Sequence, residues 1–179
     1  MNLYITSDCP LQSAKILDDK NIVKMLLDSA QILSTAIIEN SGEDFNKVEH
    51  SSLKTKKVSV TYYYKDIKLP SPTRKTHPCV NWADKTHSNY GWVYRYFHEL
   101  CNQYKLRNGS NHELFKLNRY FISGSDFMPA GPLTKFVNCA GNAGLNIDYR
   151  DMDNTLTAYK FYLADKWDLD SNIVTWYGK

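Results

Sequence analysis

Two groups near the start of the chain could act together in amine chemistry: the α-amine of Met1 and the carboxylate of Asp28. A free α-amine has a reference pKa of about 7.7–8.0, so part of it is neutral and nucleophilic close to neutral pH. An amine of this kind beside a carboxylate can form a Schiff base. We therefore take Met1 and Asp28 as the candidate catalytic pair.

The stretch that must position Asp28 reads as the first long helix. We expect a helical segment over about residues 11–38, broken near Asp18 and Asp19, since either aspartate can cap the second piece. Apolar residues recur there at helical spacing and form one face. A polar stripe falls on the opposite side. The apolar face comprises Ile22, Leu26, Ala30, Leu33 and Ile37, and the polar stripe comprises Asn21, Lys24, Asp28, Gln31 and Thr35.

The polar stripe has two interpretations. It either carries the chemistry, or it is a solvated helix face on which the Lys24–Asp28 pair contributes a few tenths of a kcal/mol (~0.3). The residues alone leave both open.

The charge of the chain is unevenly distributed. Net charge is only +3, but the segment from Lys47 to Lys85 carries nine Lys or Arg against three acids, whereas residues 151–172 are acidic. Basic residues interleaved with tyrosines at 62–64 are typical of a nucleic-acid-binding surface, and a solvated loop explains them equally well. The candidate DNA contacts in this segment are Lys54, Lys56, Lys57, Arg74, Lys75 and His77.

Length and composition predict one domain over residues 1–179. Within it we expect a short extended N-terminus, a surface insertion over 43–76 that forms a strand or small β-hairpin, and a loop-rich excursion over 119–150. No apolar run approaches the ~18 residues of a membrane span, and the start lacks the features of a signal peptide, so we expect a cytosolic protein that does not bind membranes.

The remaining periodicity predicts a mainly α fold with one helical core. We expect a short helix over 78–85, a second long helix over 89–107 capped by Ser88, another from 110 to about 118, and a last one over 153–167. The four cysteines form no CxxC pair and the histidines no HExxH pattern, so no metal is expected. The predicted core stripe of the second long helix comprises Trp92, Tyr96, Leu100 and Tyr104.

The order of these features resembles the small phage-type pyrimidine-dimer DNA glycosylases, the endonuclease V of ultraviolet repair. That family carries Asp-x-His on its first helix with a catalytic Glu seven positions after the His, and Asp19, Asn21 and Asp28 repeat the spacing. A His-Pro pair precedes the next helix in one branch, as His77-Pro78 does here. Further similarities lie at Tyr104, Arg107 and Gly109 and in the aromatic end at 175–179.

The resemblance implies an all-α DNA repair enzyme without a cofactor, with the N-terminal amine as nucleophile and Asp28 as its acid. It implies double-stranded DNA as the partner and, with similar small proteins in bacterial viruses, a phage source and the host cytoplasm. Four features depart from the family pattern: Asp28 replaces Glu, Leu27 replaces Arg, Asn21 replaces His, and Asn2 stands second where the family has a small residue, so Met1 should be retained. The implied DNA contacts add Asn21, Lys24, Trp176 and Tyr177.

Two other functions fit the same scaffold. One is a viral DNA-binding or base-modification protein without glycosylase activity, which Leu27 and a retained Met1 favour. The other is a counter-defence protein that binds a host protein or a nucleotide. Binding to duplex DNA and formation of a covalent adduct distinguish the three.

Overall fold

The computed structural model describes residues 1–42, 45–52, 57–64, 67–170 and 174–176. The fold is mainly helical, as predicted. Its α-helices are α1 (Pro10–Lys15), α2 (Asp19–Asn40), α3 (Pro78–Ala83), α4 (His87–Asn108), α5 (Asn118–Ser123) and α6 (Thr155–Leu169), with 3-10 turns at Glu113–Leu117, Gly124–Phe127 and Ala143–Leu145.

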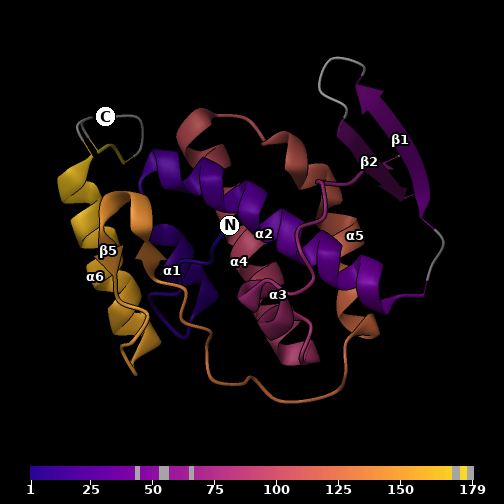
Figure 1. Cartoon of the computed structure of the whole chain (residues 1–179). Helices are drawn as coiled ribbons and strands as arrows, with labels where there is room; N and C mark the ends of the chain where they lie inside the picture. The colour runs from indigo at the N-terminus through magenta and orange to yellow at the C-terminus, as the bar shows by residue number, and fades with distance from the viewer. Residues whose placement is uncertain (43–44, 53–56, 65–66, 171–173, 177–179) are drawn as a thin grey trace.

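The two long helices, α2 and α4, pack against each other at the centre of the molecule (Figure 1). Asp18 caps α2 by accepting the Asn21 amide, which confirms the predicted break. The cap of α4 is Thr86 and not Ser88 as predicted, because Thr86 is the residue with extended backbone and its hydroxyl accepts the Asn89 amide. The helix ends at Gly109, whose φ of 74° suits glycine.

The predicted core stripe of α4 is confirmed for Trp92, Tyr96 and Leu100, which are all buried. The Trp92 ring stacks on Tyr96 at a centroid distance of 5.3 Å and meets Trp82 of α3 edge-on. Its indole nitrogen donates to the Asp8 carbonyl. The aromatic cluster thus joins three parts of the chain.

The polar stripe of α2 does not form a solvated helix face. Asn21, Asp28 and Thr35 are buried, whereas Val23 and Leu27 are exposed. The apolar stripe is buried as predicted, so most of the circumference of α2 is covered by protein.

The sheet over the insertion is antiparallel, in the order β1 (Asn46–Ser52), β2 (Lys57–Tyr64) and β3 (Ile67–Lys68). This confirms a small hairpin, which lies at the opposite end of the molecule from α6 (Figure 1). The stretch after α5 is loop-rich, as predicted, and its regular elements are the 3-10 turns at Gly124–Phe127 and Ala143–Leu145 and a two-stranded sheet of β4 (Gly141–Asn142) and β5 (Ile147–Asp148). Within this stretch, residues 128–140 form a long connection that runs back across the molecule to the small sheet beside α6 (Figure 1).

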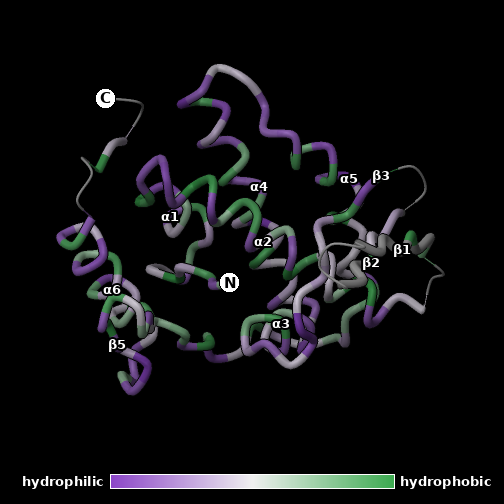
Figure 2. The backbone as a smooth tube through the Cα atoms, turned by 45° about the horizontal axis from the view of Figure 1, so that its top comes forward, coloured by the Kyte–Doolittle hydropathy of each residue, from purple (hydrophilic) through white to green (hydrophobic). Residues whose placement is uncertain are grey.

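The chain starts in the middle of the molecule, beside α2 (Figures 1 and 2). Residues 2–6 are all buried, with Leu3 and Ile5 fully inaccessible to solvent. Tyr4 is buried as well, although alternation would place it on the opposite side from its neighbours. The first residues of the chain are therefore part of the hydrophobic core.

Helix α2 is long and apolar enough to cross a membrane by length and mean hydropathy alone, although it contains no unbroken apolar run of that length. In this structure 72% of that window is buried within the protein. Such burial is typical of the core helix of a soluble protein.

We expect Trp92→Ala to lower the free energy of unfolding by about 3–5 kcal/mol, because it leaves a cavity between α3 and α4. Urea denaturation measures the change. Leu106→Ala on the same helix, at a side chain that is 66% exposed, is the control and should change it by less than about 0.5 kcal/mol. Equal stability of the two variants would contradict the core assignment.

Candidate active site

The Asp28 carboxylate contacts the start of the chain. The Asn2 amide donates to Asp28 Oδ2 at 3.0 Å, and Lys24 Nζ donates to the same oxygen at 2.6 Å. Asp28 is 8% exposed, so the carboxylate is held by these two donors and not by bulk water. The Lys24 side chain is 45% exposed, which leaves its ammonium open on one side.

The α-amine of Met1 lies three backbone bonds from the Asn2 nitrogen. Given the 3.0 Å contact of that nitrogen, the amine lies within about 7 Å of Asp28 Oδ2. Met1 itself is partly exposed. The structure therefore brings together the two groups that the sequence singled out, while their catalytic role stays a prediction.

The side chain of Asn2 is held by Tyr159 and Cys139, from later parts of the chain. Its Nδ2 donates to the Cys139 carbonyl at 2.9 Å, and its Oδ1 accepts from the hydroxyl of Tyr159 at 2.6 Å. That hydroxyl in turn accepts the Cys139 amide. Tyr159 belongs to α6, Cys139 to the long connection before it, and Asp28 to α2. Three distant segments therefore hold the second residue.

His77 forms a further wall of the site at the start of α3. Its Nδ1 accepts the Cys79 amide as the helix cap, and the ring also lies within hydrogen-bonding reach of the Met1 backbone. Burial and the nearby N-terminal charge lower the pKa of His77 below its ordinary value of 6.5. The neutral ring is the form that can cap α3.

A second amine, that of Lys166 on α6, lies next to this site. It donates to Asn21 Oδ1 and, at 3.2 Å, to the Tyr4 hydroxyl. The ammonium groups of Lys166 and Lys24 lie 5.2 and 5.6 Å from the centroid of the Tyr4 ring. Burial, followed by repulsion from Lys24, lowers the pKa of Lys166. Carboxylates lie close to both cations, since Lys24 pairs with Asp28, and Asp18 and Asp170 act on Lys166.

The other predicted DNA contacts do not gather here. Lys75 pairs with Glu39 near the C-terminal end of α2, about 16 Å along the helix from Asp28, and its neighbour Arg74 is exposed. Trp176 packs on Trp167 and donates to the Ile16 carbonyl, near the opposite end of α2. Lys54, Lys56 and Tyr177 lie outside the described residues, as does the side chain of Lys57.

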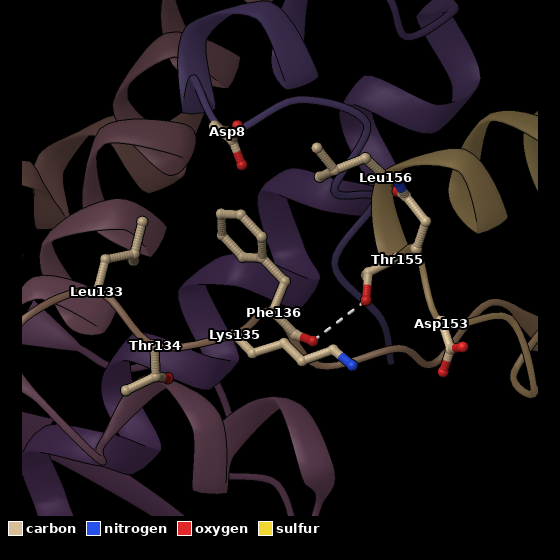
Figure 3. A pocket seen from close by; sticks show the side chains of 9 residues that line it. Asp8, Leu133, Thr134, Lys135, Phe136, Asp153, Thr155 and Leu156 are labelled. Atoms are coloured by element: carbon tan, nitrogen blue, oxygen red, sulfur yellow. Dashed lines mark hydrogen bonds between the residues drawn. The ribbon is translucent and has the colours of Figure 1, made fainter.

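A pocket of about 470 Å³ opens between the long connection and the first turn of α6 (Figure 3). Phe136 forms its floor, and Thr155 Oγ1 donates to the Phe136 carbonyl at 3.2 Å. None of the predicted site residues lines it. Among the residues that the structure describes, no three His, Cys, Asp or Glu side chains come together as a metal site. The lining residues are Asp8, Leu133, Thr134, Lys135, Phe136, Asp153, Asn154, Thr155 and Leu156.

Residues 1–117 match the sequence model of a family described as pyrimidine dimer DNA glycosylase, which covers about two-thirds of the chain. The chain belongs to the pyrimidine dimer DNA glycosylase family. The predicted resemblance is thereby confirmed at the level of the family. Searches of curated proteins and of solved structures found no significant match.

The sequence alone did not identify several residues of this candidate site. Tyr4, Tyr159 and Lys166 read as core or surface residues, and Cys139 carried no motif. Tyr159, Cys139 and Lys166 also lie beyond the matched segment. No local signal marks them, because each reaches the site through tertiary packing.

We expect His77→Asn to weaken the pH dependence of unfolding. The folded pKa of His77 lies below the unfolded value of about 6.5, so stability present above that pH is lost as the pH falls through the folded pKa. Asparagine also caps helices but does not titrate. Urea denaturation between about pH 7 and pH 5 should show a smaller loss of stability in the variant.

His112 contributes to the same pH range in both proteins, since burial lowers its pKa too. The comparison therefore concerns the difference between variant and wild type. Identical pH dependence in the two proteins would show that His77 does not titrate differently on folding.

Proposed function

We propose that this protein is a DNA glycosylase and abasic-site lyase that uses its N-terminal amine as the nucleophile and Asp28 as its acid. The observation that supports it is the 3.0 Å hydrogen bond between the Asn2 amide and Asp28, which ties the chain start to the first long helix. Both residues lie in the segment that matches the family.

The proposed reaction starts with the neutral amine of Met1 attacking C1′ of a damaged nucleotide. The carbon–nitrogen bond to the sugar forms, the bond to the base breaks, and the base leaves with a proton. Ring opening gives a protonated imine, and loss of a C2′ proton then expels the 3′ phosphate. Asp28 stabilises the cationic intermediate and transfers protons, which requires no cofactor.

The DNA strand would approach on the side of Lys24 and Lys166. Both ammonium groups lie next to the Tyr4 ring; Lys24 donates to the acid, and Lys166 donates to Asn21. Lys24 is half exposed, and Lys166 donates only to neutral oxygens in its two hydrogen bonds described above. A phosphate that bound both ammonium groups would add a negative charge to that of Asp28, which already pairs with Lys24.

Borohydride trapping on DNA with an abasic site tests the proposal. Reduction of the imine should leave a covalent protein–DNA adduct. Mass analysis of the adduct peptide should place it on the first nitrogen of the chain, either that of Met1 or, after removal of Met1, that of Asn2. An adduct on Lys166 or no adduct at all would contradict the proposed nucleophile.

We expect Asp28→Asn to slow adduct formation by about 10²–10⁴-fold, the usual contribution of a general acid–base group. The variant keeps an oxygen that can accept the Asn2 amide, so it should still unfold cooperatively. Glu39→Gln, on the same helix but paired with the exposed Lys75, is the matched control and should react like wild type. Equal rates for the two variants would remove Asp28 from the mechanism.

We expect Lys166→Gln to weaken binding to duplex DNA and to reduce the dependence of log K on log salt by about 0.9, the value for one phosphate contact. Lys160→Gln, at an exposed position of α6, should leave both unchanged. Binding curves at several salt concentrations measure the effect. A wild-type slope in Lys166→Gln would exclude this lysine from the interface.

A DNA-binding protein without glycosylase activity is the second candidate. Leu27, 47% exposed beside Asp28, presents an apolar surface at the position where the family has an arginine. Salt-sensitive duplex binding without a trapped adduct would establish this function instead.

A further inference from the structure

Two cysteines meet in the walls that hold the chain start. Cys79 lies in the first turn of α3 and Cys139 in the long connection before α6, 60 residues apart in sequence. Their sulfur atoms are 3.9 Å apart, and the Cys79 thiol donates to the Cys139 sulfur. Disulfide formation requires a sulfur–sulfur distance of about 2.05 Å, so a displacement of roughly 2 Å would join them.

The two sulfurs differ in accessibility and acidity. Cys139 is partly exposed, and the hydrogen bond from Cys79, with the positive charge of Arg150, lowers its pKa. Cys79 is fully buried, and the contact with Cys139 and burial raise its pKa. A partly exposed thiol of lowered pKa next to a buried second thiol is the arrangement of cysteines that react with peroxide and then form a disulfide with the second thiol.

We propose that Cys79 and Cys139 form a peroxide-reactive dithiol that closes to a reversible disulfide beside the N-terminal site. The Cys139 thiolate attacks a peroxide oxygen, so a sulfur–oxygen bond forms, the oxygen–oxygen bond breaks, and hydroxide leaves to become water. Cys79 then loses its proton and attacks the sulfenic sulfur of Cys139, expelling a second hydroxide that takes up that proton. Two thiols are oxidised by two electrons, and one hydrogen peroxide becomes two waters.

Closure would act on the residues that hold Asn2. The Cys139 carbonyl accepts the Asn2 side chain, and its amide donates to Tyr159. Cys79 follows directly after His77 and Pro78, at the end of the site where the Met1 backbone lies. Moving Cys139 toward Cys79 shifts the second residue of the chain, and with it the amine. The consequence for DNA cleavage rests on the proposed function, whereas disulfide formation does not.

Mass mapping of the thiols tests the proposal on the full-length protein. After exposure to hydrogen peroxide and alkylation, the peptides of Cys79 and Cys139 should be linked, and a thiol reductant should separate them. Cys139→Ser should abolish the link. Cys9→Ser and Cys101→Ser are the controls, since Cys9 is partly exposed like Cys139 and Cys101 is buried like Cys79. Both variants should retain the link between Cys79 and Cys139.

Alkylation of both Cys79 and Cys139 after peroxide treatment, or a link from either to Cys9 or Cys101, would overturn the proposal. Cys79→Ala provides a second variant in case Cys139→Ser is unstable, and it should leave Cys139 as a sulfenic acid that a dimedone probe labels. Wild type should show little of this label, since Cys79 converts the sulfenic acid to the disulfide.

Borohydride trapping on abasic DNA then measures the effect on the site. Peroxide should slow adduct formation in wild type several-fold, reductant should restore it, and Cys139→Ser should be insensitive. Unchanged trapping in a protein whose disulfide is shown by mass would overturn the link between the dithiol and the site. Failure of the proposed nucleophile would show instead as absent trapping in the reduced protein, and thiol mapping would still decide whether the pair forms.

Discussion

A buried carboxylate on the central helix determines how this chain begins. Burying an ionised carboxylate is costly unless hydrogen bonds and an opposite charge compensate for it. Asp28 obtains both from the Asn2 amide and Lys24. The first residues must therefore pass through the core next to α2, and the helices around them are arranged to enclose that path.

Chain ends are usually poorly ordered unless specific contacts hold them. Here the contacts come from every side: α2 through Asp28, α3 through His77, and α6 through Tyr159. These contacts hold Asn2 directly after the proposed nucleophile, so the amine would lose little freedom in the proposed reaction. The Cys79–Cys139 pair lies among the same residues, so the proposed disulfide would shift the chain start.

The sequence predicted the two long helices and α6 well because their apolar periodicity is strong. The helix predicted from 110 to about 118 was wrong: a 3-10 turn covers Glu113–Leu117, and the α-helix α5 follows over Asn118–Ser123, within the predicted loop-rich excursion. The sequence left open whether the polar stripe of α2 is a solvated face, since the residues that bury Asn21 and Asp28 come from α6 and from the N-terminus. Lys166 could not be found in this way, because it meets Asn21 across 145 positions of sequence. Charge alone pointed to Lys75, whose partner Glu39 lies far from Asp28. Local patterns determine helices, whereas the composition of a site depends on packing between distant segments.

An experimental structure of the borohydride-reduced complex with abasic DNA tests the central claim most directly. The account predicts a covalent bond from the first nitrogen of the chain to C1′ of the sugar, with an Asp28 oxygen within about 3 Å of that nitrogen. A bond from C1′ to any side chain, or an Asp28 carboxylate remote from the reacted nitrogen, would contradict it.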